Sequence, residues 1–456
     1  MEKINKLKKF FKSEKIDGYI IPKNDEFFGE YIPDHKDRLK YISDFTGSYG
    51  FALILNDKNY LFVDGRYTLQ ANNQSGKFFK IKTIPNELPR DILFNKKLKI
   101  GFDSKLFTKK SLNIFFGKTN CEYIPLKKNL VDKIWIRKKS ELNNKFYKLP
   151  NSAIGENYKS KVNKILVELK KSRSDFKFIT ASENNAWLLN IRGNDSKYTP
   201  IPYSYILIDK KENINFFCNL KKISPSFKKN FNKVEFTDIN STIKIHSKIN
   251  KKKFIIDDAS CSIFFENIIL KNNKILYSKG ANCSSNAIKT KNEIENIKKA
   301  HIYDGAALTK YLYWLKNNFV KKKITEIGAA QKLFNFRKKN KSFKFLSFPT
   351  ISGTGPNGAI IHYQASNKTN RKLNEGDIYL VDTGGQYRFG TTDVTRTISL
   401  NNHNLRIKKI FTRVLKGHIA VANYKLKKNS CGELIDREAR KYLNRLVLNQ
   451  IIHFYS

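Results

Sequence analysis

The sequence is poor in cysteine, and the few cysteines that it has lie far apart. They are Cys121, Cys218, Cys261, Cys283 and Cys431. An odd and scattered set without a CxxC pair predicts neither a disulfide framework nor a zinc knuckle. Free thiols suit a reducing compartment, so we expect a cytoplasmic protein.

Long apolar runs are also missing. The sequence has no stretch of about 18 apolar residues, so it predicts no membrane span. Residues 1–16, MEKINKLKKFFKSEKI, lack the apolar core and small-residue cleavage site of a signal peptide. Their apolar side chains recur at helical spacing, which predicts an amphipathic helix with Ile4, Leu7, Phe10 and Phe11 on one face.

Acidic residues are scarce: 40 Asp and Glu stand against 87 Lys and Arg, a net charge of +47. Such an excess is typical of proteins that neutralise nucleic-acid phosphates, and a basic nucleic-acid-binding protein stays an alternative. The excess is mostly lysine, however, spread along the chain among residues of A/T-rich codons, with no RNP motif, zinc finger or helix-turn-helix. We therefore expect no specific nucleic-acid partner, only salt-sensitive adhesion to polyanions.

One pattern of strands occurs twice in the first 260 residues. Residues 51–64 predict a hairpin, and a further strand follows at 99–104. Residues 203–219 repeat the hairpin, and 253–260 repeat the later strand. Similar elements at similar spacing indicate an internal duplication of one α/β domain.

Length and polar stretches together predict three domains. A chain of 456 residues has room for about three. The polar, Pro-containing stretch 138–154 indicates a linker. We therefore expect domains over residues 1–137, 155–285 and 286–456.

The third domain is predicted to open with a long helix. Thr290 and Glu293 have the spacing of a capping box. Apolar residues then follow at helical spacing: Ile294, Ile297, Ala300, Ala307, Leu308, Tyr311, Leu312 and Leu315. His301 on this helix is predicted to be a surface or packing residue.

Two aspartates flank a short turn further on. The runs IYLVDTG and TTDVTRTI predict the strands of a hairpin. A turn centred on Tyr387–Arg388 would place Asp382 directly opposite Asp393, with Cβ atoms roughly 5 Å apart. Like charges so close disfavour ionisation unless a cation lies between them, and oxygen ligands suit Mn, Mg or Zn. Because two carboxylates are too few to close a metal site, ordinary turn-flanking aspartates stay an alternative.

The segment 345–398 resembles the metal-binding hairpin of the pita-bread (M24) metallopeptidases, and most of all the aminopeptidase P branch. The resemblance implies that Asp382 chelates one metal ion and that Asp393 bridges two. It implies that His362, in NGAIIHY, orients substrate and helps to move protons. It further implies two Mn²⁺ ions, with Zn²⁺ as an alternative, and hydrolysis of the first bond of peptides with proline in second position.

The earlier domains resemble creatinase-type amino-terminal domains. The resemblance is carried by YISDFTGSYG (41–50), DGRYTLQA (64–71) and ENNAWLLNIRGNDSKYTPIPYSY (183–205). Three-domain members of the family have two such domains before the catalytic one. The fold implied is therefore α/β (α+β), with two creatinase-type domains followed by a pita-bread domain.

The same resemblance indicates an incomplete catalytic domain. The family completes its metal shell with a His from an HGTGHGVG-like segment and two later Glu, which nothing after Asp393 supplies. Glu433 and Glu438 fall in a predicted helix. We therefore expect a truncated aminopeptidase P with impaired or no activity, and the alternative is a non-catalytic remnant or binding module. The third domain is expected to be loose.

Three other features are predicted to be minor. Arg192, in LNIRG, either reaches the active site of a neighbouring subunit in a homodimer or forms an ordinary ion pair. The glycines of SGTGPNG (352–358) lack the GK[ST] ending of a phosphate-binding loop and predict a turn near the substrate. His418 lies in an apolar helical pattern and is predicted to be structural.

Overall fold

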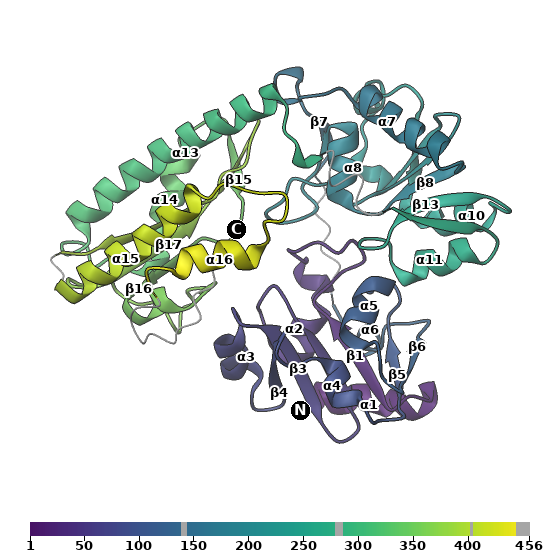
Figure 1. The fold of residues 1–456 in the computed structure, drawn as a ribbon, viewed down its shortest axis with the longest axis horizontal. Coiled ribbons are helices and arrows are strands. Elements are labelled where there is room, and N and C mark those ends of the chain that lie inside the picture. Colours follow the sequence, from purple (N-terminus) through teal and green to yellow (C-terminus); the bar gives the residue numbers. More distant parts are fainter. Residues whose placement is uncertain (138–143, 279–285, 402–404, 444–456) are drawn as a thin grey trace. The chain divides into compact units, whose positions relative to one another are not determined.

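The structure is a computed structural model that describes residues 1–137, 144–278, 286–401 and 405–443 (Figure 1). The chain forms two compact units. The first comprises Met1–Thr309, Phe334–Pro349 and Thr383–Val394. The second comprises Lys310–Leu333, Thr350–Asp382 and Thr395–Ser456. Within the described ranges, no helix has both the length and the apolar character needed to cross a membrane.

The first unit begins with a six-stranded sheet. Its strands are β1 (Gly18–Pro22), β2 (Phe51–Leu55), β3 (Asn59–Asp64), β4 (Lys80–Ile84), β5 (Lys99–Phe102) and β6 (Glu122–Pro125). The accompanying helices are α1 (Glu2–Glu14), α2 (Arg38–Ser43), α3 (Thr68–Ser75), α4 (Pro89–Leu93), α5 (Lys109–Phe116) and α6 (Leu130–Ile134). The strand order is β4-β3-β2-β1-β5-β6, and β1 pairs antiparallel with β2 but parallel with β5.

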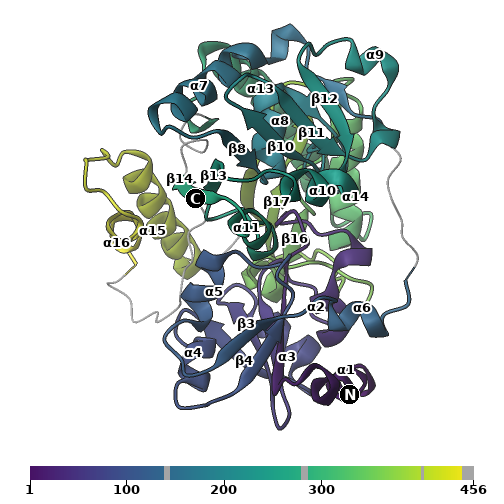
Figure 2. The same cartoon turned by 90° about the vertical axis from the view of Figure 1, so that its right-hand side faces the viewer.

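A second sheet in the same unit repeats this arrangement. Its strands are β8 (Phe176–Ile179), β10 (Tyr205–Asp209), β11 (Ile214–Cys218), β12 (Val234–Asp238), β13 (Lys253–Asp257) and β14 (Lys274–Ser278). Its helices are α7 (Tyr158–Lys171), α8 (Ser182–Leu189), α9 (Pro225–Lys228), α10 (Thr242–Ser247) and α11 (Ile263–Leu270). The order is β12-β11-β10-β8-β13-β14, part of which is visible edge to edge in Figure 2. Because β8 pairs antiparallel with β10 and parallel with β13, as β1 does with β2 and β5, the predicted duplication is confirmed.

Both sheets are buried on their two faces. In β2, Ala52 and Ile54 face the core that contains the buried residues of α1, whereas Phe51, Leu53 and Leu55 face a second core. The predicted amphipathic helix α1 contributes Ile4, Leu7 and Phe11 to the first of these cores. Burial of apolar surface contributes about 25 cal/mol per Å², so strands buried on both faces anchor each domain.

A short strand pair joins the predicted linker to the second domain. β7 (Tyr147–Lys148) pairs antiparallel with β9 (Ile191–Arg192). Phe146, just before β7, is buried in a core of the second domain. Residues 138–143 of the predicted linker lie outside the described residues, and the domain boundaries stay a prediction.

His246 in α10 is a neutral histidine in an aromatic core. Its side chain is fully buried, and its ring centroid lies 4.3 Å from that of Phe178 and 6.1 Å from that of Phe254. The Nδ1 atom lies 2.8 Å from the carbonyl oxygen of Thr242, so we assign its hydrogen to that atom. Burial lowers the pKa of His246 to about 4.

This histidine should make the second domain sensitive to acid. Above pH 6.5 it is neutral in both states, but as pH falls from 6.5 towards 4 the unfolded chain takes up a proton that the folded domain does not. The free energy of unfolding at pH 4.5 should therefore be about 2–3 kcal/mol lower than at pH 7 from this group alone. Urea denaturation of His246→Phe should show a smaller difference between pH 7 and pH 4.5 than the wild type. Exposed His418 provides the control, His418→Gln; a full difference in His246→Phe would contradict the assignment.

The remaining elements belong to the third predicted domain. The helices are α13 (Lys291–Asn318), α14 (Glu326–Lys338), α15 (Leu405–Ala422) and α16 (Gly432–Arg440). The other elements are β15 (Phe343–Leu346), β16 (Ile351–Thr354), the 3₁₀ helix η5 (Gly355–Ala359), β17 (Ile378–Thr383), β18 (Gly385–Tyr387) and β19 (Val394–Ser399). β15 pairs with β18, and β16, β17 and β19 form a three-stranded sheet in that order. α15 packs beside α16 (Figure 2), where a Cβ on Gly417 would lie 2.3 Å from the Ala439 carbonyl oxygen.

The start of α13 confirms the predicted capping box. The Glu293 carboxylate accepts hydrogen bonds from Thr290 N (2.8 Å) and Thr290 Oγ1 (2.9 Å), and Glu293 N donates to Thr290 Oγ1. The predicted apolar stripe is buried only from Ala300 onwards, because Ile294 in the first turns is 42% exposed. His301 is exposed, as predicted.

Candidate metal centre

Asp382 and Asp393 lie on neighbouring strands of one sheet. Asp382 is in β17, is half-buried, and pairs across the sheet with Ile351 of β16. Asp393 is exposed and directly precedes β19, which is the neighbour of β17 on its other side. The predicted hairpin strands are therefore present.

The predicted turn is wrong by one residue, and the predicted pairing of the two hairpin strands is wrong with it. Tyr387 N donates to Gly390 O (2.8 Å), and Thr392 N donates to Gly385 O (2.9 Å), so the turn is Arg388–Phe389. The direct opposition of Asp382 and Asp393 required a turn at Tyr387–Arg388. The turn lies close to α13, since a Cβ on Gly390 would lie 3.0 Å from the Ala300 Cβ.

The environment of Asp393 raises its pKa. Desolvation of the carboxyl group raises it above the ordinary value of 3.8, and the nearby imidazole of His301 opposes the rise. A bound cation would favour the ionised carboxylate. His301, predicted to be only a surface or packing residue, therefore contributes to the electrostatics of the site.

His362 lies in the loop after η5 with an unusual backbone conformation. It is half-buried, and its φ of 55° is in the left-handed region, which few residues other than glycine adopt. Such a conformation costs about 1–2 kcal/mol and persists only where surrounding contacts hold it. The predicted turn at SGTGPNG is confirmed as the end of β16 followed by η5.

Glu326, the first residue of α14, holds this loop at both ends. Its buried carboxylate accepts hydrogen bonds from Thr354 N (2.8 Å), Tyr363 OH (2.9 Å) and Arg371 N (3.0 Å). Asn357 Nδ2 also donates to it. These bonds connect the residue after His362 and the two ends of the loop to a single side chain, so Glu326 is a positioning residue for His362.

A buried ion pair supports the residue that follows Asp382. Arg337 donates to Asp304 through Nε (2.6 Å) and Nη2 (2.9 Å), and Tyr387 OH donates to the same carboxylate at 2.8 Å. Arg337 Nη1 donates to Thr383 Oγ1. All four side chains are buried, so α13, α14 and the hairpin meet at one fully bonded polar cluster.

The sequence held a weak signal for these supporting residues. Asp304 lies four residues after Ala300 and three before Ala307, on the apolar face of its helix, where an unpaired acid would be unfavourable. Glu326 is the first residue of α14, a position where acidic residues are common. Neither signal identifies the partner, because the partners lie 33 and 45 residues away at Arg337 and Arg371.

The donor atoms at this site suit a hard divalent cation. Asp382 and Asp393 offer carboxylate oxygens, the ligand type that Mn²⁺ and Mg²⁺ prefer and that Zn²⁺ accepts. Among the described residues, however, no cluster of three or more His, Cys, Asp or Glu is arranged to hold a metal ion. Glu433 pairs with Arg437 on the predicted helix α16, and Glu438 pairs with Lys441 directly after it. The described residues therefore fit part of a metal shell.

Comparison with known proteins agrees with this arrangement. Models of the Creatinase/Prolidase N-terminal domain match residues 3–132 and 137–295, and the model of Metallopeptidase family M24 matches residues 295–455. The Probable Xaa-Pro aminopeptidase P of Laccaria bicolor is 34% identical over 97% of this chain and 71% of its own length. The chain belongs to the Xaa-Pro aminopeptidase family of M24 metallopeptidases. A second member, Xaa-Pro aminopeptidase 1 of Dictyostelium discoideum, is 32% identical over 97% of this chain and 74% of its own length.

The fold of this chain is also similar to those of solved structures in the same family. The X-prolyl aminopeptidase of Caenorhabditis elegans, described as a cytosolic enzyme with a di-nuclear active site, matches with a TM-score of 0.91 and 28% identity. That match covers 98% of this chain and 77% of the other. The prolidase of Pyrococcus horikoshii, with 23% identity and a TM-score of 0.50, shares the fold over 63% of this chain and 78% of its own. The predicted fold, two creatinase-type domains followed by a pita-bread domain, is confirmed.

Proposed function

We propose that this member of a metal-dependent aminopeptidase family uses Asp382 and Asp393 as metal ligands and releases the first residue of peptides with proline in second position. The observation that carries the proposal is the similarity to proteins named Xaa-Pro aminopeptidase along nearly the whole chain. The carboxylates on β17 and before β19 are oxygen donors of the required kind. Mn²⁺ is the expected metal and Zn²⁺ the alternative, and the cytosolic relative supports a cytoplasmic location.

The chemistry follows from the substrate bond. The amide before proline has no N–H, and the ring restricts the residue that precedes it, so a dedicated site is needed. Divalent cations, when bound, polarise the peptide carbonyl and lower the pKa of a water molecule. In the chain itself, Asp382 and Asp393 would hold the cations through their carboxylate oxygens, and the His362 imidazole would hydrogen-bond the peptide or carry a proton. The bonds of Glu326 to the loop fix the position from which His362 acts.

A second candidate is a binding module without turnover. It is favoured by the lack of a cluster of three metal-ligating residues among the described residues. Two carboxylates bind a divalent cation weakly, because Mn²⁺ and Mg²⁺ complete their shells with several further oxygens. In that case the two creatinase-type domains would carry the function. A homodimer stays a prediction for both candidates.

Metal binding and cleavage separate the two. With the full chain, titration calorimetry with Mn²⁺ and with Zn²⁺ should show binding that weakens at least about ten-fold in the Asp382→Asn and Asp393→Asn variants. Asp57→Asn, at an exposed carboxylate in the turn between β2 and β3, is the control and should bind as the wild type does. Metal-dependent release of arginine from an Arg-Pro-Pro peptide would support the peptidase. Binding without release would favour the module, and equal affinity in all variants would exclude these ligands.

A further inference from the structure

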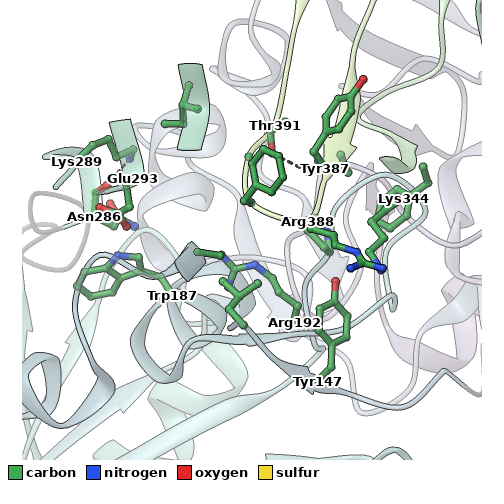
Figure 3. Close-up of a pocket in the computed structure, with 18 residues that line it drawn as sticks. Tyr147, Trp187, Arg192, Asn286, Lys289, Glu293, Lys344, Tyr387, Arg388 and Thr391 are labelled. Atoms are coloured by element: carbon green, nitrogen blue, oxygen red, sulfur yellow. Dashed lines mark hydrogen bonds between the residues drawn. The ribbon is translucent and has the colours of Figure 1, made fainter. Parts of the chain in front are cut away.

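The first unit contains a cavity of about 460 Å³ that none of the three predicted site residues lines (Figure 3). Its walls come from β7, α8 and β9 of the second creatinase-type domain and from the start of α13. Residues 386–391 at the turn that follows β18, called the β18 hairpin below, complete them. The volume falls within the usual range for small-molecule sites. Among the residues that line it are Tyr147, Trp187, Arg192, Glu293, Lys344 and Arg388.

Positive charge dominates the cavity. Four cationic side chains line it, those of Arg192, Lys289, Lys344 and Arg388, and none makes an ion pair with a carboxylate among the described residues. The acid in the wall, Glu293, already accepts two hydrogen bonds from Thr290 in the capping box of α13. Its charge attracts Arg192, but one carboxylate stands against four cations, so the walls carry an excess of positive charge.

Arg192 is held rigidly with part of its guanidinium free for a ligand. Its Nη1 atom donates to the backbone carbonyls of Ala186 (3.1 Å) and Ile191 (3.0 Å). The prediction that it forms an ordinary ion pair is therefore wrong within the described part of the chain. Burial lowers the pKa of Arg192, although an arginine stays protonated at neutral pH. A desolvated, immobilised cation favours an anion in contact with it.

The rest of the wall suits a ring. Trp187 contributes an indole, and in Figure 3 the hydroxyl end of Tyr147 points between Arg192 and Arg388. Burial raises the pKa of Tyr147, so its hydroxyl is a neutral hydrogen-bond donor. Two guanidinium groups and a phenol are donors that match the oxygens of a carboxylate or phosphate.

We propose that this cavity binds a small organic anion, with its carboxylate or phosphate group on Arg192 and Arg388 and an aromatic or other planar part against Trp187. The site does not depend on the metal centre or on peptide hydrolysis. The walls of the cavity are positively charged, whereas the candidate metal centre offers the negatively charged carboxylates of Asp382 and Asp393. The bound molecule would contact both the second creatinase-type domain and the β18 hairpin.

The test uses calorimetry on the full metal-free chain in 0.15 M salt, with phenyl phosphate, phenylacetate and inorganic phosphate as probes. At least one aromatic anion should bind more tightly than inorganic phosphate. Its dissociation constant should rise about ten-fold or more in Arg192→Met and in Arg388→Met. Arg388 is exposed at the hairpin tip, so this variant should fold even if the other does not. Arg173→Met, an exposed arginine of the same domain outside the cavity, is the matched control.

Each outcome decides the proposal. Preference for phenyl phosphate or for phenylacetate would assign the anion type. Equal binding of inorganic phosphate and both aromatic probes would overturn the role of the planar part. No binding in the wild type, or equal weakening in Arg173→Met, would overturn the site and indicate adhesion through the net charge of +47.

Discussion

Replacing Arg337 with methionine is expected to destabilise the first unit by about 3–5 kcal/mol, because it leaves the buried Asp304 carboxylate without its cation. The pair is nearly inaccessible, with exposed fractions of 0% for Arg337 and 2% for Asp304. Tyr387 would then be the remaining donor to Asp304, and Thr383 would lose its donor from Arg337. Urea denaturation followed by circular dichroism measures the change.

Two further variants make this prediction specific. The double variant Asp304→Leu with Arg337→Met removes both charges and should recover a large part of the loss, as replacement of buried ion pairs by apolar residues does. Arg437→Met breaks an exposed pair with Glu433 and should change stability by about 0.5 kcal/mol or less. If Arg337→Met were no more harmful than Arg437→Met, the cluster would not support the hairpin that follows Asp382.

Replacing Glu326 with glutamine should loosen the loop that carries His362, at a cost of about 3 kcal/mol. Both carboxylate oxygens of Glu326 accept hydrogen bonds, among them those from Thr354 N and Arg371 N. In the glutamine variant an NH₂ group replaces one of these oxygens. This group would face another donor, so that hydrogen bond would be lost. Hydrogen exchange of the amides of Thr354 and Arg371 should become about 100-fold faster, since each 1.4 kcal/mol of local opening is a factor of ten.

A neighbouring acid provides the control for this experiment. Glu375 is exposed, and it accepts from Asn401 rather than from the loop. Glu375→Gln should leave the exchange of Thr354 and Arg371 unchanged. Unchanged exchange in Glu326→Gln as well would mean that the left-handed conformation of His362 is held by other contacts.

How far the sequence predicts this structure depends on the range of the interactions. The strand pattern of both creatinase-type domains and the capping box of Thr290 and Glu293 arise from neighbouring residues, and the structure confirms them. The hairpin turn lies one residue further along than predicted, and Gly390 beside it lies close to Ala300, a neighbour distant in the chain that local patterns do not reveal. Periodicity likewise marks Asp304 as unusual without identifying Arg337.

The candidate site divides in the same way. His362, Asp382 and Asp393 are proposed as site residues from a family resemblance in a continuous segment. Glu326 and the residues of the anion cavity come from segments that the fold brings together, so local patterns do not reveal them. Arg192 illustrates this, because the sequence predicts either a contact with a neighbouring subunit or an ion pair, whereas in the structure it donates to backbone carbonyls in a cavity wall.

The repeated strand order has a consequence for how the chain is made. The two sheets have the same strand order, so β1 and β8 occupy equivalent positions. When both domains are unfolded at the same time, one of these strands could therefore pair in the sheet of the other domain. During synthesis the ribosome releases residues 1–137 before the second copy exists, and domains fold largely as they emerge. Synthesis from the amino terminus therefore lets the first domain fold before the equivalent strands of the second domain are present. Refolding of the whole chain from denaturant would instead allow the two sets of strands to compete for the same pairings.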